Sequence, residues 1–313
     1  MQNLPLTSLL AVHAHPDDET LSTGGLLAAT AAAGLPVTLV TLTRGEQGEV
    51  IGPLKGELEG HGVALARHRE GELAGALAAL GVRDHLFLDQ EDAAQSRFED
   101  SGMAWLDPEL GAGRSETASL GDDVAPGALV RVPMDRAAEL LAHVICARRP
   151  HTVVTYEPQG GYGHPDHVRT HEITAAALEL AGRGMHGLHG HRPAQFLWSV
   201  IPADLVRAGR ARLAEVGNSL ADSSAGATYP GPDAPLASVS TWGEGDPLAL
   251  DVRPVLGRVA AALRAHATQV QWTELLGEPL ELGNAGVALA GSYALSNDIL
   301  APLLSHEFYV PAR

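Results

Sequence analysis

The sequence predicts an α/β fold in which a mostly parallel sheet is covered by helices on both faces. Over the first two hundred residues, short apolar runs rich in β-branched residues alternate with longer segments rich in Ala and Leu. Such an alternation builds a parallel sheet, because each helix crosses back over the sheet before the next strand begins. The chain has 313 residues, 45% of them hydrophobic, so it can bury a large core without disulfides or structural metal.

Strands are predicted where a compact apolar run ends in polar residues, which is the form of a strand buried on both faces. The predicted strands comprise residues 9–14, 37–42, 85–88, 151–156 and 195–201. Helices are predicted between them, and Gly34, Gly81 and Pro150 mark three of their ends. The predicted helices comprise residues 21–33, 63–80, 135–148, 165–181 and 254–268.

Two long segments, 43–62 and 89–133, interrupt this alternation and are rich in Gly, Asp, Glu and Ser. Loops of this length in a compact domain are usually functional or disordered. Residues 1–201 are predicted to form a Rossmann-like core. Residues 202–313 are predicted to form a less regular C-terminal extension packed on it within one structural domain, with a Gly- and Pro-rich connector at 219–235.

Charge and composition disfavour several classes of partner. The chain has 21 basic and 38 acidic side chains, a net charge of −17, and Lys55 is its only lysine. This charge opposes attraction to phosphate backbones and anionic membranes, so we expect neither a nucleic-acid nor a membrane partner. Cys146 is the only cysteine, which excludes an intrachain disulfide framework. The first residues lack the features of a signal peptide, and we expect a cytoplasmic protein.

The first chemical cluster is HAHPDDE at 13–19, directly after the first strand. Open α/β sheets bind ligands at this carboxyl end of the strands. Burying His15, Asp17 and Asp18 together is costly unless a cation compensates the carboxylates. The simpler alternative is an N-cap, in which Asp17 or Asp18 satisfies the first turn of the following helix. One aspartate is enough for capping, so the cluster exceeds that requirement.

The second cluster is GGYGHPDH at 160–167, which follows the strand at 151–156. His164 and His167 are three residues apart and share a helix face. Two imidazoles and a carboxylate make the three-ligand set of catalytic zinc, which leaves one position open for water. Either cluster alone is also compatible with an ordinary helix start. The repeated His-Pro-Asp pattern at two strand ends favours a metal site.

These two clusters resemble the signatures of the LmbE-like, or PIG-L, family of zinc-dependent de-N-acetylases, which act on N-acetylglucosaminyl conjugates. Further segments resemble the branch of this family that deacetylates N-acetylglucosaminyl-inositol in mycothiol biosynthesis. They are RGEQGEVIG (44–52), HREGELAGALAALGV (68–82), DSGMA (100–104) and RPHTVVTYEPQGGYGHPDHVRTHEIT (149–174). The resemblance is strong over about residues 8–200 and weak in the C-terminal third.

The resemblance implies that His15, Asp18 and His167 bind one metal ion per chain. Zn²⁺ is expected from the ligand types, although Fe²⁺ fits the same set. Asp17 lies beside a ligand without being one. The resemblance implies that it is the general base that takes a proton from the attacking water.

Three further residues of the second cluster have implied catalytic roles. Tyr162 donates a hydrogen bond to the oxyanion of the tetrahedral intermediate. His164 acts as an imidazolium that stabilises this oxyanion or protonates the leaving amine. Asp166 orients His164 and raises its pKa by its charge.

The resemblance also implies which residues bind the substrate. Arg69 and Asp100 match the sugar-contacting positions of the family, and Glu49 is a third candidate on the inositol side. An arginine can donate to two adjacent hydroxyls and an aspartate can accept from them. The alternative is that Arg69 and Asp100 simply form a salt bridge with each other.

The predicted function is metal-dependent removal of the acetyl group from N-acetylglucosaminyl-inositol, a small aminosugar conjugate. Two alternatives from the same family are a deacetylase of N-acetylglucosaminyl-malate in bacillithiol synthesis and a mycothiol S-conjugate amidase. The long loops argue against the former, and the absence of a lysine at residues 20–23 argues against the latter. A non-haem iron enzyme with two His and one carboxylate would leave Asp17, Tyr162 and His164 without a role. A binding module without activity would not need these residues either, and the oligomeric state is left open.

Overall fold

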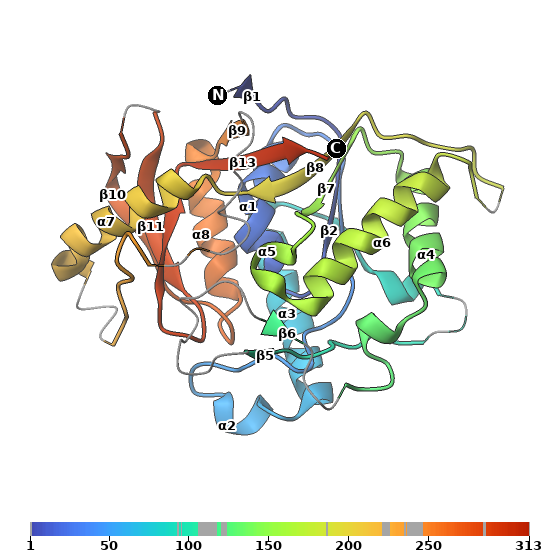
Figure 1. Ribbon diagram of the computed structural model, residues 1–313, viewed down its shortest axis with the longest axis horizontal. Coiled ribbons are helices and arrows are strands. Elements are labelled where there is room, and N and C mark those ends of the chain that lie inside the picture. The colour runs from blue at the N-terminus through green and yellow to red at the C-terminus, as the bar shows by residue number, and fades with distance from the viewer. Residues whose placement is uncertain are drawn as a thin grey trace.

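The computed structural model of the chain is built around an eight-stranded sheet (Figure 1). The described residues are 2–92, 94, 96–105, 118–119, 124–185, 187–220, 226–234, 236, 247–283 and 286–312. The strand order is β1 (Gln2–Asn3), β9 (Leu248–Asp251), β13 (His306–Pro311), β8 (Gln195–Val200), β7 (Thr152–Tyr156), β2 (Leu9–His13), β3 (Val37–Thr41) and β4 (Asp84–Phe87). Neighbouring strands are parallel except at β13, which is antiparallel to β8 and β9. The predicted mostly parallel sheet is confirmed.

Helices cover both faces of this sheet, as predicted, because its central strands bury side chains on both sides. In β2, Leu9 and Ala11 pack with helices α1, α3 and α8, whereas Leu10 and Val12 pack with α4 and α6. The main helices are α1 (Asp18–Ala32), α3 (Gly62–Leu80), α4 (Met134–Arg148), α6 (Pro165–Ala181), α7 (Ala203–Leu220) and α8 (Leu256–Ala265). Short helices are α2 (Lys55–Leu58) and α5 (Gly160–Gly163), with 3-10 turns at Leu88–Glu91, Leu129–Arg131 and Arg253–Val255.

The C-terminal third contains more regular structure than the sequence pattern indicated. It adds β9 and β13 to the main sheet and forms a separate antiparallel sheet, on which α7 packs (Figure 1). This second sheet consists of β10 (Gln271–Glu281), β11 (Ala288–Ala294) and β12 (Leu300–Leu304), and a small ribbon pairs β5 (Ala104–Trp105) with β6 (Ala118–Ser119). Strands from both sides of residue 201 share one sheet. The division of the chain at this residue stays a prediction. Part of the predicted connector at 219–235 lies outside the described residues.

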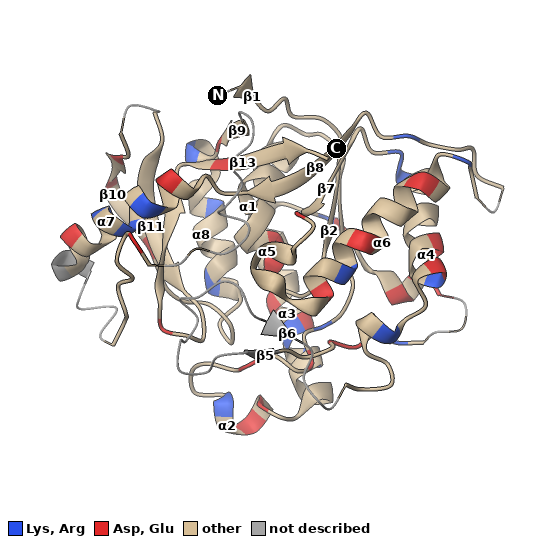
Figure 2. Cartoon of the chain, in the orientation of Figure 1, with Lys and Arg blue, Asp and Glu red and all other residues tan. Residues whose placement is uncertain are grey.

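The charged residues of the helices are mixed in sign. Figure 2 shows Lys and Arg close to Asp and Glu on α4, α6 and α7. In the part of the chain that the structure describes, no helix combines the length and the apolar character needed to cross a membrane.

Strand β13 is fastened to α1 by a contact that requires a glycine. The carboxylate of Glu307 accepts hydrogen bonds from the backbone N–H groups of Gly25 and Leu26, at 2.6 and 2.8 Å. A Cβ atom at Gly25 would lie 2.3 Å from Cγ1 of Val252 and 2.8 Å from Oε1 of Glu307. Any side chain at Gly25 therefore pushes α1 away from the C-terminal strands.

We predict that Gly25→Ala lowers the free energy of unfolding by about 1–3 kcal/mol, the usual cost of overpacking a well-packed site. Gly71→Ala is the matched control, because Gly71 is also helical and no atom lies within 4 Å of its added Cβ. The control is expected to stabilise by roughly 0.5–1 kcal/mol, because alanine is a better helix former. Urea denaturation of both variants measures the difference, and equal stabilities would contradict the packing argument.

Candidate active site

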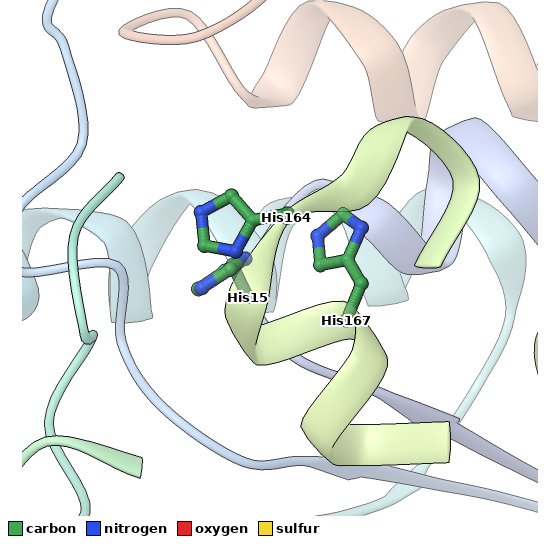
Figure 3. Close-up of side chains that lie close together, drawn as sticks. All are labelled: His15, His164 and His167. Carbon is green, nitrogen blue, oxygen red and sulfur yellow. The ribbon is translucent and has the colours of Figure 1, made fainter. Parts of the chain in front are cut away.

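The two His-Pro-Asp clusters meet at the carboxyl ends of β2 and β7, which are adjacent parallel strands. Because parallel strands end at the same edge, residues about 150 positions apart in the sequence become neighbours. Figure 3 shows the rings of His15, His164 and His167 close together, the latter two at the beginning of α6. Their centroids are 4.7 Å apart for His15 and His164, 4.8 Å for His164 and His167, and 5.3 Å for His15 and His167.

Asp18 lies between the two imidazoles that the sequence predicts as ligands. Its Oδ1 is 3.2 Å from Nε2 of His167, and its Oδ2 is 3.3 Å from Nδ1 of His15. Ligand atoms ~2.0–2.1 Å from a tetrahedral zinc are ~3.3 Å from one another. The distance from Asp18 to each imidazole is therefore compatible with binding of a small divalent cation between them.

His167 has one ring nitrogen left for a metal. Its Nδ1 lies 3.1 Å from the carbonyl oxygen of Gly160, which can only accept, so Nδ1 carries the proton. Its Nε2 is buried and makes no hydrogen bond with the described residues, and Oδ1 of Asp18 lies 3.2 Å from it. A neutral imidazole anchored through one nitrogen and free at the other is the usual form of a metal-binding histidine. A Cβ at Gly160 would lie 2.9 Å from Cβ of His167, so this close anchoring needs a glycine.

Two other groups of potential ligands overlap with this set. One is His15 with His164 and His167, and the other is His15 with Asp100 and Asp166; within each group the ligand atoms lie within 4.8 Å of one another. His164 is the weaker candidate for a ligand, because its Nδ1 accepts a hydrogen bond from the backbone N–H of Asp166 at 3.1 Å. In the neutral ring the proton is then on Nε2, which makes that nitrogen a donor.

His164 and Asp166 are arranged differently from the expectation. The carboxylate of Asp166 lies 3.2 Å from Nε2 of His15 and accepts the backbone N–H of Ser101 at 2.9 Å. Asp166 contacts the imidazole of His164 through its backbone N–H, which donates to Nδ1. Burial, His15 and His167 lower the pKa of His164 well below its usual value, against the opposing charge of Asp166. The site therefore favours neutral His164, whereas the sequence analysis expects an imidazolium.

Negative charge surrounds His15. Burial opposes a charge on this imidazole, but Asp100, Asp166 and Asp18 outweigh it and raise the pKa of His15 well above its usual range. All three carboxylates are buried. A cation bound here would compensate this charge, which is a second reason why the residues fit a metal ion.

Asp17 does not cap the helix that it precedes. It occupies the N-cap position of α1, yet its side chain makes no capping hydrogen bond. The capping alternative is therefore excluded for Asp17. Burial and the neighbouring Asp18 raise the pKa of Asp17 well above its usual value, and a nearby cation would lower it again. Asp17, the residue directly before Asp18, thus makes no side-chain hydrogen bond that caps the helix.

Tyr162 lies on the irregular turn between β7 and α6. Its ring centroid is 5.1 Å from that of His167 and 5.9 Å from that of His164. Burial and the carboxylates of Asp18 and Asp17 raise the pKa of Tyr162 well above 10, so the phenol keeps its proton and can donate. The carboxylate of Glu157 fixes this turn by accepting the N–H groups of residues 159 and 161, at 2.6 and 2.7 Å.

The predicted sugar-binding residues hold the loop that follows β3. Arg69 donates to the carbonyl oxygens of Gly45 and Glu49, at 2.6 and 2.9 Å, and its side chain is buried. Asp100 accepts the backbone N–H of Gln47 at 3.2 Å and lies 3.7 Å from His15. The Glu49 side chain is exposed. Arg69 thus pairs with carbonyl groups, in place of the salt bridge with Asp100 that was the alternative.

Sequence reasoning missed two supports of the site. Tyr156 ends β7 and stacks on His167, with centroids 4.2 Å apart and ring planes at 6°. Its hydroxyl accepts the backbone N–H of Ala14 at 2.9 Å. Its position as the last residue of a strand that leads into the site was a usable signal. The second support is His266, which contacts Glu19 from the C-terminal third at 2.8 Å, and no local pattern signals this contact.

The fold resembles solved deacetylases. A deacetylase in complex with teicoplanin, from the biosynthesis pathway of teicoplanin, superposes with a TM-score of 0.51 at 18% identity and covers 98% of this chain and 99% of its own. N,N'-diacetylchitobiose deacetylase from Pyrococcus horikoshii gives a TM-score of 0.50 at 16% identity, covering 83% and 70%. At these identities the likeness concerns the fold alone.

Sequence comparison gives closer relatives. A 1D-myo-inositol 2-acetamido-2-deoxy-alpha-D-glucopyranoside deacetylase from Kineococcus radiotolerans is 43% identical over 96% of this chain and 76% of its own length. The protein of the same name from Rhodococcus jostii is 39% identical over 97% and 91%. Residues 10–178 match the family described as PIG-L: GlcNAc-PI de-N-acetylase. Given a match over more than half of the chain and these relatives along nearly all of it, the chain belongs to the PIG-L family of de-N-acetylases.

Proposed function

We propose that this protein removes the acetyl group from N-acetylglucosaminyl-inositol, as a step of mycothiol biosynthesis. The names and the identity of its relatives support this substrate. The observation that carries the chemistry is the convergence of His15, Asp18 and His167 at the sheet edge, where Asp17 directly precedes Asp18 in the chain and does not cap the helix. A base beside a metal-ligand set is the arrangement that amide hydrolysis requires.

The proposed cofactor is one Zn²⁺ per chain, held by His15, Asp18 and His167. The imidazole–carboxylate distances, and the Nε2 of His167, which makes no hydrogen bond with the described residues and lies 3.2 Å from Oδ1 of Asp18, support this set. Two nitrogens and one carboxylate oxygen suit zinc, and Fe²⁺ prefers similar ligands. When bound, the cation supplies Lewis-acid polarisation of the amide carbonyl and lowers the pKa of water.

The side chains around it then divide the proton transfers. Asp17 takes a proton from water as the water oxygen bonds to the amide carbon. Tyr162, whose phenol is neutral, donates a hydrogen bond to the developing oxyanion. His164 can donate a second hydrogen bond to this oxyanion through its Nε2–H, because its Nδ1 accepts the N–H of Asp166. As the carbon–nitrogen bond breaks, the proton that Asp17 took from water passes to the amine nitrogen, and acetate and the free amine are the products.

The loops at 44–50 and 97–102 are proposed to read the sugar. They are joined reciprocally: Glu46 accepts the N–H of Asp100 at 3.1 Å, and Asp100 accepts the N–H of Gln47 at 3.2 Å. The guanidinium of Arg69 fixes the first loop by donating hydrogen bonds to two of its carbonyl groups. Direct contacts with the sugar are proposed for Arg69, Asp100 and Glu49.

The absence of a membrane or nucleic-acid partner and the cytoplasmic location also stay predictions.

We predict that His15→Ala loses most of its bound metal, since two remaining ligands hold a labile ion poorly. His151→Ala is the control, because His151 is exposed and lies at the opposite end of β7. Elemental analysis after dialysis measures metal per chain. Full metal content in His15→Ala would refute the proposed ligand set.

We predict that Asp17→Asn keeps its metal and loses about 10²–10⁴-fold in kcat, the usual effect of removing a general base. Asp135→Asn is the matched control, because Asp135 is an exposed acidic residue in the first turn of α4. Release of free amine measures turnover, and elemental analysis measures metal. If Asp17→Asn turns over at nearly the parent rate, another group activates the water.

The substrate is tested by comparing kcat/KM of the purified protein on N-acetylglucosaminyl-inositol, N-acetylglucosaminyl-malate and a mycothiol S-conjugate. We expect the inositol conjugate to be preferred by at least about 10-fold, because a pocket with fixed donors and acceptors penalises an aglycone that leaves them unpaired. A higher kcat/KM on the malate conjugate would assign the protein to bacillithiol synthesis. A higher value on the S-conjugate would make it an amidase.

A further inference from the structure

The turn after α8, residues 266–270, lies against the first His-Pro-Asp cluster although it belongs to the C-terminal third. Nε2 of His266 is 2.8 Å from Oε1 of Glu19, and the side-chain amide of Gln269 donates to the carbonyl oxygen of Pro16 at 2.9 Å. These two contacts are made on either side of Asp17. The predicted helix at 254–268 ends earlier, at Ala265, and this turn is the result.

Asp17 needs such support because its backbone is in an unfavourable conformation. Its φ is 113° and its ψ is −34°, in the region that favours glycine. A residue held there costs about 1–3 kcal/mol and persists only when its surroundings fix it. The N–H of Asp17 donates to Oε2 of Glu19 at 3.0 Å. The carboxylate of Glu19 is therefore a direct restraint on the backbone conformation of Asp17.

Glu19 in turn depends on His266. Both side chains are completely buried, and Asp17 and Asp18 are next to Glu19 in the sequence, so Glu19 is in a region of negative charge. Oε1 of Glu19 accepts from the hydroxyl of Thr20 and faces Nε2 of His266, which leaves Oε2 for the N–H of Asp17. Without the imidazole, a buried carboxylate would lose its donor from the C-terminal third and be free to reorient.

We propose that His266 is a positioning residue for the general base: it fixes the carboxylate of Glu19 beneath the N–H of Asp17 and so holds Asp17 in its strained conformation. Gln269 assists from the other side through Pro16. The inference rests on the proposed role of Asp17 as the base. It gives the C-terminal third a part in catalysis through the placement of Asp17.

The kinetic test compares His266→Ala and His266→Gln with the parent protein. His266→Ala is expected to lose about 10- to 100-fold in kcat, because a misplacement near 1 Å has effects of this size. KM and metal content are expected to stay unchanged, since the His266 side chain contacts Glu19 and Thr20 and not the proposed metal ligands. His266→Gln keeps a donor for Glu19 and is expected to recover part of kcat. His191→Ala is the control, because its Nε2 hydrogen bond to Pro150, at 2.7 Å, is made outside the site.

A second measurement does not depend on the substrate. Hydrogen exchange of a peptide covering residues 14–22, followed by mass spectrometry, is expected to be faster in His266→Ala than in the parent or His191→Ala. If the parent protein does not deacetylate the inositol conjugate but this exchange still rises, the proposed function fails and the positioning contact stands. A parent-like kcat together with parent-like exchange in His266→Ala overturns the inference. If His266→Ala does not fold, Gln269→Ala is measured in its place, with the same expected and overturning results.

Discussion

Three buried carboxylates, from Asp18, Asp100 and Asp166, lie within 3.7 Å of the ring nitrogens of His15. Burying this much negative charge is unfavourable unless donors and a cation compensate it. The chain supplies donors from its backbone: the N–H of His15 reaches Asp18, and that of Ser101 reaches Asp166. The conformations of the flanking loops therefore follow from the need to point amide groups at carboxylates. The remaining charge is what makes the edge of the sheet suitable for a divalent ion.

The parts of the fold and site that could be predicted are those encoded locally. Strand β2 is apolar on both faces and is followed at once by its polar cluster, and the same holds for β7, so the convergence of His15 and His167 follows from parallel pairing. The position of β13 could not be predicted, because its pairing with β8 and β9 is decided by packing between distant segments. Hydrogen-bond partners could not be predicted from the sequence either. The imidazole of His164 accepts from the backbone N–H of Asp166 and not from a group on its carboxylate.

Arg69 illustrates why residue type alone does not fix a role. A buried arginine near a polar site is compatible with binding hydroxyl groups, but its guanidinium here donates to two carbonyl groups of one loop. Cβ atoms at Gly45 and Gly48 would lie 2.4 and 2.3 Å from Nη1 of Arg69. Gly45 and Gly48 thus leave the space that the guanidinium of Arg69 occupies. If this loop reads the sugar as proposed, that recognition depends on Arg69 through the loop's conformation, without a direct contact being needed.

The place of β13 has a consequence for how the protein is made. This strand lies between β8 and β9, so the edge of β8, which ends at residue 200, stays uncovered until the strand beginning at residue 306 is synthesised. At ~5–20 residues per second that interval lasts roughly 5–20 s. An unpaired strand edge is a template for pairing with another chain. The newly made polypeptide therefore has a period on the ribosome in which aggregation competes with completion of its sheet.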